Sequence, residues 1–217
     1  MTGLMMKKSE RIEKIEEYLE ELFWEPKCEL NYSKDYELLI AIVLSAQTTD
    51  KRVNSVTEVL FDKYSSLEEL KNAKIEDLET ILRPLGSFRK KALYVKEIAT
   101  LLADKYDNKV PVDRAILESF PGVGRKTVNV FFGEFYNIPA IAVDTHVERV
   151  SKRLGLAKDN DNVKEVEERL EKAFKREDWA KRHLQLVLFG RYHCKAVKPM
   201  CEDCKLKEIC KYQKKKH

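Results

Sequence analysis

The stretch Phe120-Pro121-Gly122-Val123-Gly124-Arg125-Lys126 carries most of the fold information in this 217-residue chain. The residues on either side, 114–120 and 125–135, are expected to be helical. Two of the seven glycines of the chain lie between these segments. Glycine tolerates the positive φ of a tight turn and the close approach of another backbone. The stretch therefore predicts a helix, a tight turn and a second helix.

The start of the second helix is a predicted anion-binding site. Backbone N–H groups in the first turn of a helix have no helical partner, and the helix dipole places partial positive charge there. A DNA phosphate would suit this site, with Gly122, Val123, Gly124 and Arg125 as its predicted contacts. A plain helical hairpin without a ligand would show the same glycine turn, so this alternative remains open.

The periodicity of apolar residues predicts helix through nearly all of the chain, and hence an all-α fold. Residues 92–102 and 163–174 follow helical spacing. The apolar run 38–44 is predicted to be a buried helix, because it lacks the turn residues that would flank a buried strand. Helix-start signals are found at Ser9, Asp35, Ser66, Asp113 and Asp178.

Composition narrows the possible classes of protein. The chain is 43% hydrophobic but contains no apolar run of roughly 18 residues, so we expect no membrane span. The start of the chain shows no signal or transit peptide, which predicts a cytoplasmic protein. The net charge is only +4, but residues 190–217 hold nine Lys or Arg against three Asp or Glu. This basic tail suits a phosphate backbone, although a solvated chain end would have the same composition.

Four of the five cysteines fall within the last 24 residues, as Cys194, Cys201, Cys204 and Cys210. The spacing C-x6-C-x2-C-x5-C is typical of a metal site, and four thiolates satisfy either an iron-sulfur cluster or tetrahedral zinc. Two disulfides would require an oxidising compartment, which the sequence does not indicate. Cys28 lies outside this pattern and is expected to remain a thiol.

These motifs together resemble those of the endonuclease III family of helix-hairpin-helix DNA glycosylases. The resemblance includes Phe120–Lys126, then Val143-Asp144-Thr145-His146, and then the four cysteines, and it extends from residue 38 to residue 210. It implies two helical lobes: a six-helix barrel over 28–138 that carries the hairpin, and a cluster lobe over 1–27 and 139–217. It also implies a [4Fe-4S] cluster on the cysteines rather than zinc.

The resemblance implies that Lys126 and Asp144 are the catalytic residues. Opening the sugar by β-elimination requires an imine at C1′, which lysine forms as a nucleophile. The first turn of a helix, beside Arg125, disfavours positive charge on Lys126 and so favours the reactive amine. A carboxylate at Asp144 would stabilise charge on the sugar and move protons. It is also a predicted N-cap for a helix over 145–154, and both roles are compatible.

Further residues are expected to contact DNA. An enzyme that acts on a base inside a duplex must extrude the nucleotide and fill the hole that remains. By resemblance Gln47 fills it, although the sequence alone is equally consistent with a polar residue at a helix end. A second wedge aligns with Ser87, where the family commonly has leucine, so Phe88 is the other candidate. His146 is expected to contact a phosphate or structure the pocket, with a core histidine as the alternative.

The resemblance implies a bifunctional enzyme of base excision repair. It would remove oxidised pyrimidines from double-stranded DNA and cleave 3′ of the abasic site as a DNA glycosylase and lyase, acting as a monomer at the nucleoid. Lys126 disfavours a mismatch-specific glycosylase, which would typically have tyrosine at this position. The other alternative is a DNA-binding module without catalytic activity, in which the four cysteines hold zinc.

Overall fold

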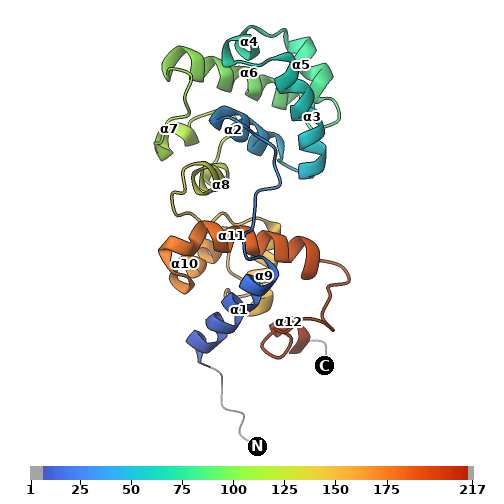
Figure 1. Cartoon of the computed structure of the whole chain (residues 1–217), viewed down its shortest axis with the longest axis vertical. Helices are drawn as coiled ribbons and strands as arrows, with labels where there is room; N and C mark the ends of the chain where they lie inside the picture. Colours follow the sequence, from blue (N-terminus) through green and yellow to red (C-terminus); the bar gives the residue numbers. More distant parts are fainter. Residues whose placement is uncertain (1–6, 215–217) are drawn as a thin grey trace, which may run out of the picture. The chain divides into compact units, whose positions relative to one another are not determined.

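The computed structural model describes residues 7–214, and all of their regular secondary structure is helical (Figure 1). The all-α prediction is confirmed. Residues 1–6 at the start of the chain and 215–217 at the end of the basic tail lie outside the described residues. Among residues 7–214, every helix is too short or too polar to cross a membrane. None of the five cysteines forms a disulfide.

The described chain divides into two compact units. The hairpin unit comprises residues 28–136, and the cysteine unit comprises residues 7–27 and 137–214. The helices of the hairpin unit are α2 (Asp35–Leu44), α3 (Asp50–Lys63), α4 (Leu67–Asn72), α5 (Ile75–Leu82), α6 (Phe88–Lys105), α7 (Arg114–Glu118) and α8 (Arg125–Phe135).

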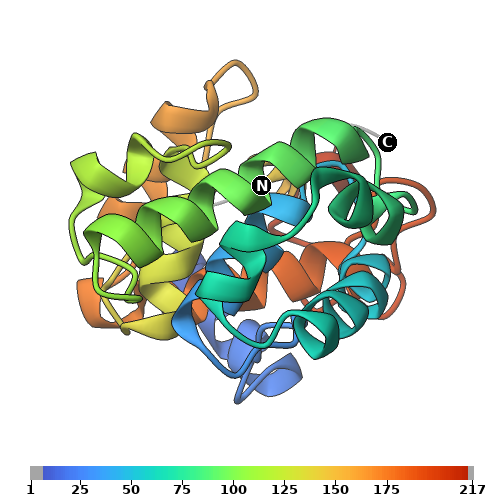
Figure 2. The ribbon, with the colours of Figure 1, turned by 90° about the horizontal axis from the view of Figure 1, so that it is seen from above.

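Helix α2 is the centre of the hairpin unit. Every side chain from Tyr36 to Leu44 is buried, so the apolar run 38–44 is the buried helix that the sequence predicts. Helix α2 packs against α3, α6 and α8, and Figure 1 shows it between α6 and α8. The long helix α6, green in Figure 2, packs against α4 and α5. Its buried stripe of Ala92, Val95, Ile98 and Leu102 follows the predicted helical spacing.

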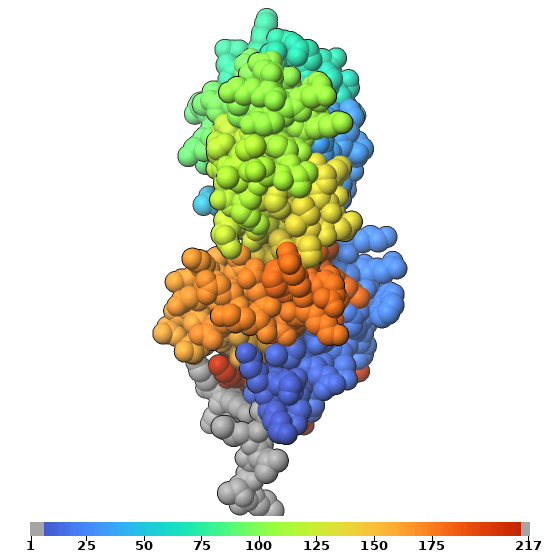
Figure 3. All heavy atoms as spheres, turned by 90° about the vertical axis from the view of Figure 1, so that its left-hand side faces the viewer, coloured from blue at the N-terminus to red at the C-terminus, as the bar shows by residue number. Residues whose placement is uncertain are grey.

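The cysteine unit packs helices from both ends of the chain around one core. Its elements are α1 (Lys8–Leu22), α9 (Thr145–Leu154), α10 (Val163–Ala173), the 3₁₀ turn η1 (Arg176–Asp178), α11 (Trp179–Leu188), the π-helical turn η2 (Phe189–His193) and α12 (Lys211–Lys214). Helix α10 buries Val166 and Leu170 and exposes Lys164 and Glu168. The outer surface of this helix is orange in Figure 3.

Side-chain caps explain where several helices begin. Ser66 and Asp113 accept hydrogen bonds from the backbone N–H groups of Glu69 and Ile116, as their sequence signals predict. Asp178 precedes α11, but its side chain does not cap the helix, because the turn η1 runs directly into α11. The signals at positions 9 and 35 are displaced by one or two residues, since α1 and α2 begin at Lys8 and Asp35.

Candidate functional site

The predicted hairpin is formed by α7 and α8 and depends on Gly122. The φ of Gly122 is +73°, in the left-handed region. A Cβ atom at this position would lie 2.5 and 2.7 Å from two ring carbons of Tyr94 on α6. Arg114 of α7 donates a hydrogen bond of 2.7 Å to Asn129 of α8 and holds the two helices together. The predicted positive φ is therefore present at Gly122, but the group that approaches closely is the side chain of Tyr94 and not the predicted backbone.

The first turn of α8 forms an open cationic surface. Gly124 precedes the helix in an extended conformation, and no atom lies within 4 Å of the position of a Cβ atom there. Arg125 and Lys126 are the first two residues of α8 and are exposed, and the first turn contains no acidic residue. Because the N–H groups of a first helical turn lack helical partners, this surface is suited to an anion.

Gln47 lies in the turn that follows α2, exposed and with a φ of +58°. This conformation is uncommon for a residue with a side chain, and it costs roughly 1–3 kcal/mol. Helix α2 ends at Leu44, so Gln47 is not in the last helical turn. The backbone thus holds Gln47 in a strained conformation at the protein surface.

Lys91 of α6 donates hydrogen bonds to this turn. Its residue is only 5% exposed, and its Nζ donates to the carbonyl oxygen of Ala46 (2.9 Å) and to Oγ1 of Thr48 (3.1 Å). Burial lowers the pKa of Lys91 below its ordinary value of 10.5. Sequence reasoning missed this residue. The available signal was a lysine in register with the buried stripe of α6, four residues before Val95.

The second predicted wedge lies at the start of α6. Ser87 is exposed with a φ of +55°, and Phe88 is half-buried beneath the guanidinium of Arg89, 5.0 Å from the ring centre. The backbone N–H of Lys91 donates to the carbonyl oxygen of Ser87 (3.1 Å). The first turn of α6 therefore connects the turns of Gln47 and Ser87.

Asp144 and His146 belong to the cysteine unit, at the start of α9. Asp144 is half-buried, and its Oδ1 accepts a hydrogen bond of 2.7 Å from the backbone N–H of Val147, which confirms the predicted cap. His146 is also half-buried. Its Nδ1 lies 3.2 Å from Nη2 of Arg149, which has protons only to donate, so this ring nitrogen accepts.

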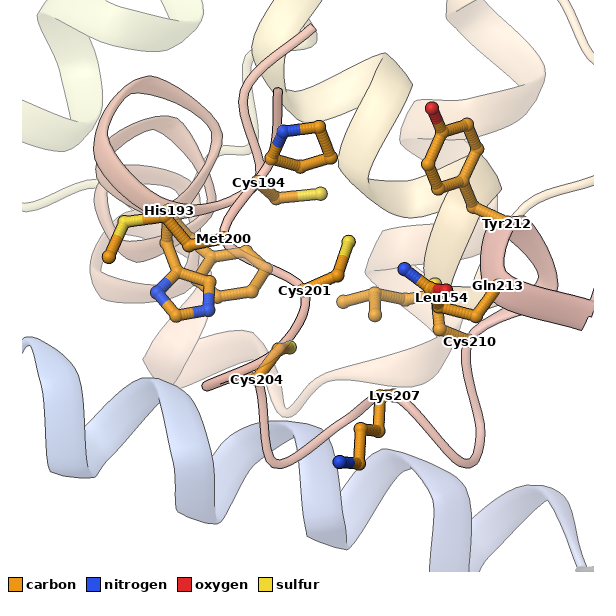
Figure 4. Close-up of a pocket in the computed structure, with 12 residues that line it drawn as sticks. Leu154, His193, Cys194, Met200, Cys201, Cys204, Lys207, Cys210, Tyr212 and Gln213 are labelled. Atoms are coloured by element: carbon orange, nitrogen blue, oxygen red, sulfur yellow. The ribbon is translucent and has the colours of Figure 1, made fainter. Parts of the chain in front are cut away.

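The four predicted metal ligands line one cavity of the cysteine unit (Figure 4). The cavity has about 330 Å³ of space between atoms, part of it open to solvent, and its other walls include Leu154, Phe189 and Pro199. In Figure 4 the side chains of Cys194 and Cys201 extend into the same space, with Cys210 beyond them. No three metal-binding side chains of residues 7–214 are arranged around a single ion. The four cysteines therefore share one cavity in this structure.

A π-helical turn and two arginines of α9 hold the first cysteine. Cys194 follows η2, and its N–H donates to the carbonyl oxygen of Phe189 (2.7 Å). Arg153 donates to Sγ of Cys194 (3.4 Å) and to the carbonyl oxygen of Lys195 (2.7 Å). Arg149 donates to the carbonyl oxygen of Cys194 (3.2 Å). Residues 194 and 195 are therefore joined to α9 by several hydrogen bonds.

The cavity disfavours thiolates unless a cation is bound. Burial, followed by the charges of the neighbouring cysteines, raises the pKa of the Cys204 thiol to about 11. Burial also raises the pKa of Cys194, against the opposing effect of Arg153. A metal ligand must lose its proton, so metal binding at this site releases protons. The donor set, four thiols with partly apolar walls, fits a soft metal or an iron-sulfur cluster.

Three comparisons with known proteins indicate the same family. Residues 40–176 match the model of the HhH-GPD superfamily base excision DNA repair proteins. Endonuclease III of Bacillus subtilis is 44% identical over 196 residues, 90% of each chain. The solved structure of a trapped endonuclease III–DNA covalent intermediate, in an estranged-adenine complex, has a TM-score of 0.92 and 45% identity, and it covers 98% of this chain and 99% of that one.

A thermostable thymine-DNA glycosylase has a TM-score of 0.84 at 24% identity over 96% of this chain and all of its own, which indicates a shared fold alone. The sequence identity to the endonuclease III structure is nearly twice as high, 45%, over 98% of this chain. The chain therefore belongs to the endonuclease III family, within the HhH-GPD superfamily of base excision DNA repair proteins.

Proposed function

We propose that this protein is a bifunctional DNA glycosylase and abasic-site lyase that removes oxidised pyrimidines from double-stranded DNA. The observation that carries the proposal is the 45% identity, over 98% of the chain, to an endonuclease III trapped covalently on DNA. An exposed lysine in the first turn of α8 supports it, because a covalent mechanism needs an accessible nucleophile.

Lys126 is the proposed nucleophile. Its Nζ forms a bond to C1′ of deoxyribose while the bond from C1′ to the base breaks, and the departing base takes the electron pair and a proton. Opening of the sugar ring then gives an imine. The imine acidifies C2′, so that loss of a C2′ proton breaks the bond between C3′ and its oxygen. Water finally releases the lysine. Lys126 lies in the first turn of α8, at the positive end of the helix dipole.

Asp144 is the proposed carboxylate. A negative charge near C1′ stabilises the positive charge that develops as the base leaves, and the same group moves protons during ring opening. Its hydrogen bond to the N–H of Val147 supports this role, because it fixes the position of the carboxylate. One oxygen is engaged in the cap, so the other is the proposed partner of the sugar.

Gln47 is proposed to fill the space left by the extruded nucleotide, with Ser87 or Phe88 as a second contact. The exposed, strained conformation of Gln47 supports this role, since strain at a surface turn is typical of functional positions. The hairpin residues Gly122, Val123, Gly124 and Arg125 are proposed to hold a backbone phosphate at the start of α8. Gln47, the hairpin and Lys126 all belong to the hairpin unit.

The four cysteines are proposed to hold a [4Fe-4S] cluster. Four thiols that line one cavity suit either zinc or a cluster, and membership of the endonuclease III family favours the cluster. When bound, the cluster would cross-link the four cysteines and so hold the loop of residues 194–210 in one conformation. A brown preparation that contains iron and sulfide would support this assignment, and a colourless one with one zinc per chain would contradict it.

Borohydride trapping on a duplex with an abasic site tests the proposal. Reduction of the imine leaves the enzyme linked to DNA, so we expect a covalent adduct with the unmodified protein and none with Lys126→Gln. The matched control is Lys164→Gln, because Lys164 is also exposed and is the second residue of its helix, α10. If Lys126→Gln still forms the adduct, the assignment of Lys126 as the nucleophile is wrong. If the unmodified protein forms no adduct, the assignment of lyase activity is wrong.

A panel of duplexes identifies the substrate. Thymine glycol, dihydrouracil, uracil, 8-oxoguanine and a guanine–thymine mismatch are scored separately for base release and strand cleavage. We expect both products from the oxidised pyrimidines. Activity confined to the mismatch would favour the mismatch-specific alternative, and binding without any product would favour a module that only binds DNA.

A further inference from the structure

The ammonium group of Lys91 lies in a buried position that is unfavourable for a charged side chain. Lys91 is 5% exposed, and its two hydrogen-bond acceptors are an uncharged carbonyl and a hydroxyl. Burying an ammonium group without a carboxylate partner is costly, and the lowered pKa of Lys91 reflects this cost. A methionine would fill the same part of the α6 stripe without it. The hydrogen bonds that Lys91 makes are therefore the feature that requires explanation.

The acceptors of Lys91 lie directly on either side of Gln47. Ala46 precedes Gln47 and Thr48 follows it, so one Nζ atom holds both ends of a single residue. Further hydrogen bonds within the turn join the N–H of Thr48 to the carbonyl oxygen of Ser45 (3.0 Å) and Oγ1 of Thr48 to that of Ala46 (3.3 Å). These contacts offset the cost of the left-handed backbone at Gln47.

We propose that Lys91 is a positioning residue for lesion recognition, which holds the Gln47 turn in the conformation that enters the duplex. This inference rests on the proposed function. Lys91 acts through Gln47 and does not itself touch DNA. Its backbone N–H also joins it to Ser87, so a single residue of α6 connects both turns that carry the wedge candidates. The turn is thus formed before DNA binds, and no ordering cost is added when the nucleotide leaves the stack.

The test is a double-mutant cycle between Lys91→Met and Gln47→Ala. We expect Lys91→Met to slow single-turnover base release from a duplex by about 10- to 100-fold, since small displacements of a positioned group have effects of this size. In the Gln47→Ala background the same substitution should change the rate by less than about 2-fold, because the residue that it positions is gone. An equal loss in both backgrounds would overturn the proposal, as would a normal rate for Lys91→Met.

Lys96→Met is the matched control. Lys96 also lies on α6 and donates to a backbone carbonyl, that of Ala73 (2.5 Å), in a segment away from Gln47. Base release by Lys96→Met should match that of the unmodified protein, and a loss as large as that of Lys91→Met would overturn the proposal. Thr48→Val removes one acceptor without emptying the core, so it should show a smaller loss that again disappears with Gln47→Ala.

Trapping on a single-stranded abasic oligonucleotide separates this inference from the proposed function. A single strand leaves no hole in a stack, so Lys91→Met should trap it as well as the unmodified protein does. A parallel loss of trapping would show that Lys91→Met damages the whole site and would overturn the positioning role. If the unmodified protein itself fails to trap, the proposed function fails instead, and the two failures are distinguished.

Discussion

Replacement of Gly122 by alanine tests the physical basis of the hairpin. Alanine at a φ of +73° costs roughly 1–2 kcal/mol for the left-handed conformation. Its Cβ atom would also lie 2.5 and 2.7 Å from the ring of Tyr94 and 3.1 Å from Cγ1 of Val43. Overpacking of this kind typically costs about 1–3 kcal/mol. We therefore expect Gly122→Ala to lower the free energy of unfolding of the hairpin unit by about 2–5 kcal/mol.

Urea and thermal denaturation measure this change, with Gly124→Ala as the matched control in the same turn. Gly124 has a φ of −122°, and its Cβ position is open, so we expect a change within about 0.5 kcal/mol. In a Tyr94→Ala background the ring clash is absent, so Gly122→Ala should there cost only the conformational term and any adjustment of the 3.1 Å contact with Val43. Equal midpoints for Gly122→Ala and Gly124→Ala would refute the reasoning.

Three further predictions concern the cysteine unit. Asp144→Asn should keep the cap on Val147 and the stability, because asparagine caps as well as aspartate, while base release falls by about 10²- to 10⁴-fold in single-turnover assays. Burial alone would raise the pKa of Glu20, but its contacts with Lys181 and Arg182 hold it below 4.5. The stabilisation that these contacts give to the folded state is therefore complete above pH 4.5, and it is lost as the pH falls through the lower pKa that Glu20 has in the folded protein. In denaturation experiments Glu20→Gln should cost about 1.5–3 kcal/mol at pH 7 and progressively less as the pH falls below 4.5. Cys204→Ser should lower the visible absorbance and iron content of purified protein, and unchanged values would exclude Cys204 as a ligand.

Local sequence signals predicted most of the helices. Asp113 and Asp144 cap helices where the sequence places them, because a cap depends on residues within one turn. The glycine turn was equally predictable, since glycine tolerates a φ of +73° at position 122 and leaves room for the ring of Tyr94. Asp178 shows the limit of this approach. The 3₁₀ turn that precedes α11 removes the need for its cap, and that turn has no clear sequence signal.

The sequence predicts which residues form the candidate site, and their roles stay predictions, but it does not predict the contacts that support them. Spacing and resemblance indicated the cysteines, and the structure gathers them at one cavity. The left-handed backbone of Gln47 depends on Lys91, which is more than forty residues away in the chain. Arg149 likewise holds the carbonyl oxygen of Cys194 across a separation of 45 residues. Contacts at such distances follow from tertiary packing, which one sequence does not specify.

Helix α9 connects two parts of the cysteine unit, the residue Asp144 at its start and the first cysteine near its end. Its ten residues form a rod of about 15 Å, with Asp144 at one end and Arg153, which touches Sγ of Cys194, near the other. Gly190 presses against this rod, since a methyl group there would lie 2.8 Å from Cβ of His146. Glycine at position 190 therefore lets η2 pack closely against α9, so that one helix contacts the segment before the first cysteine and also carries Asp144 at its start.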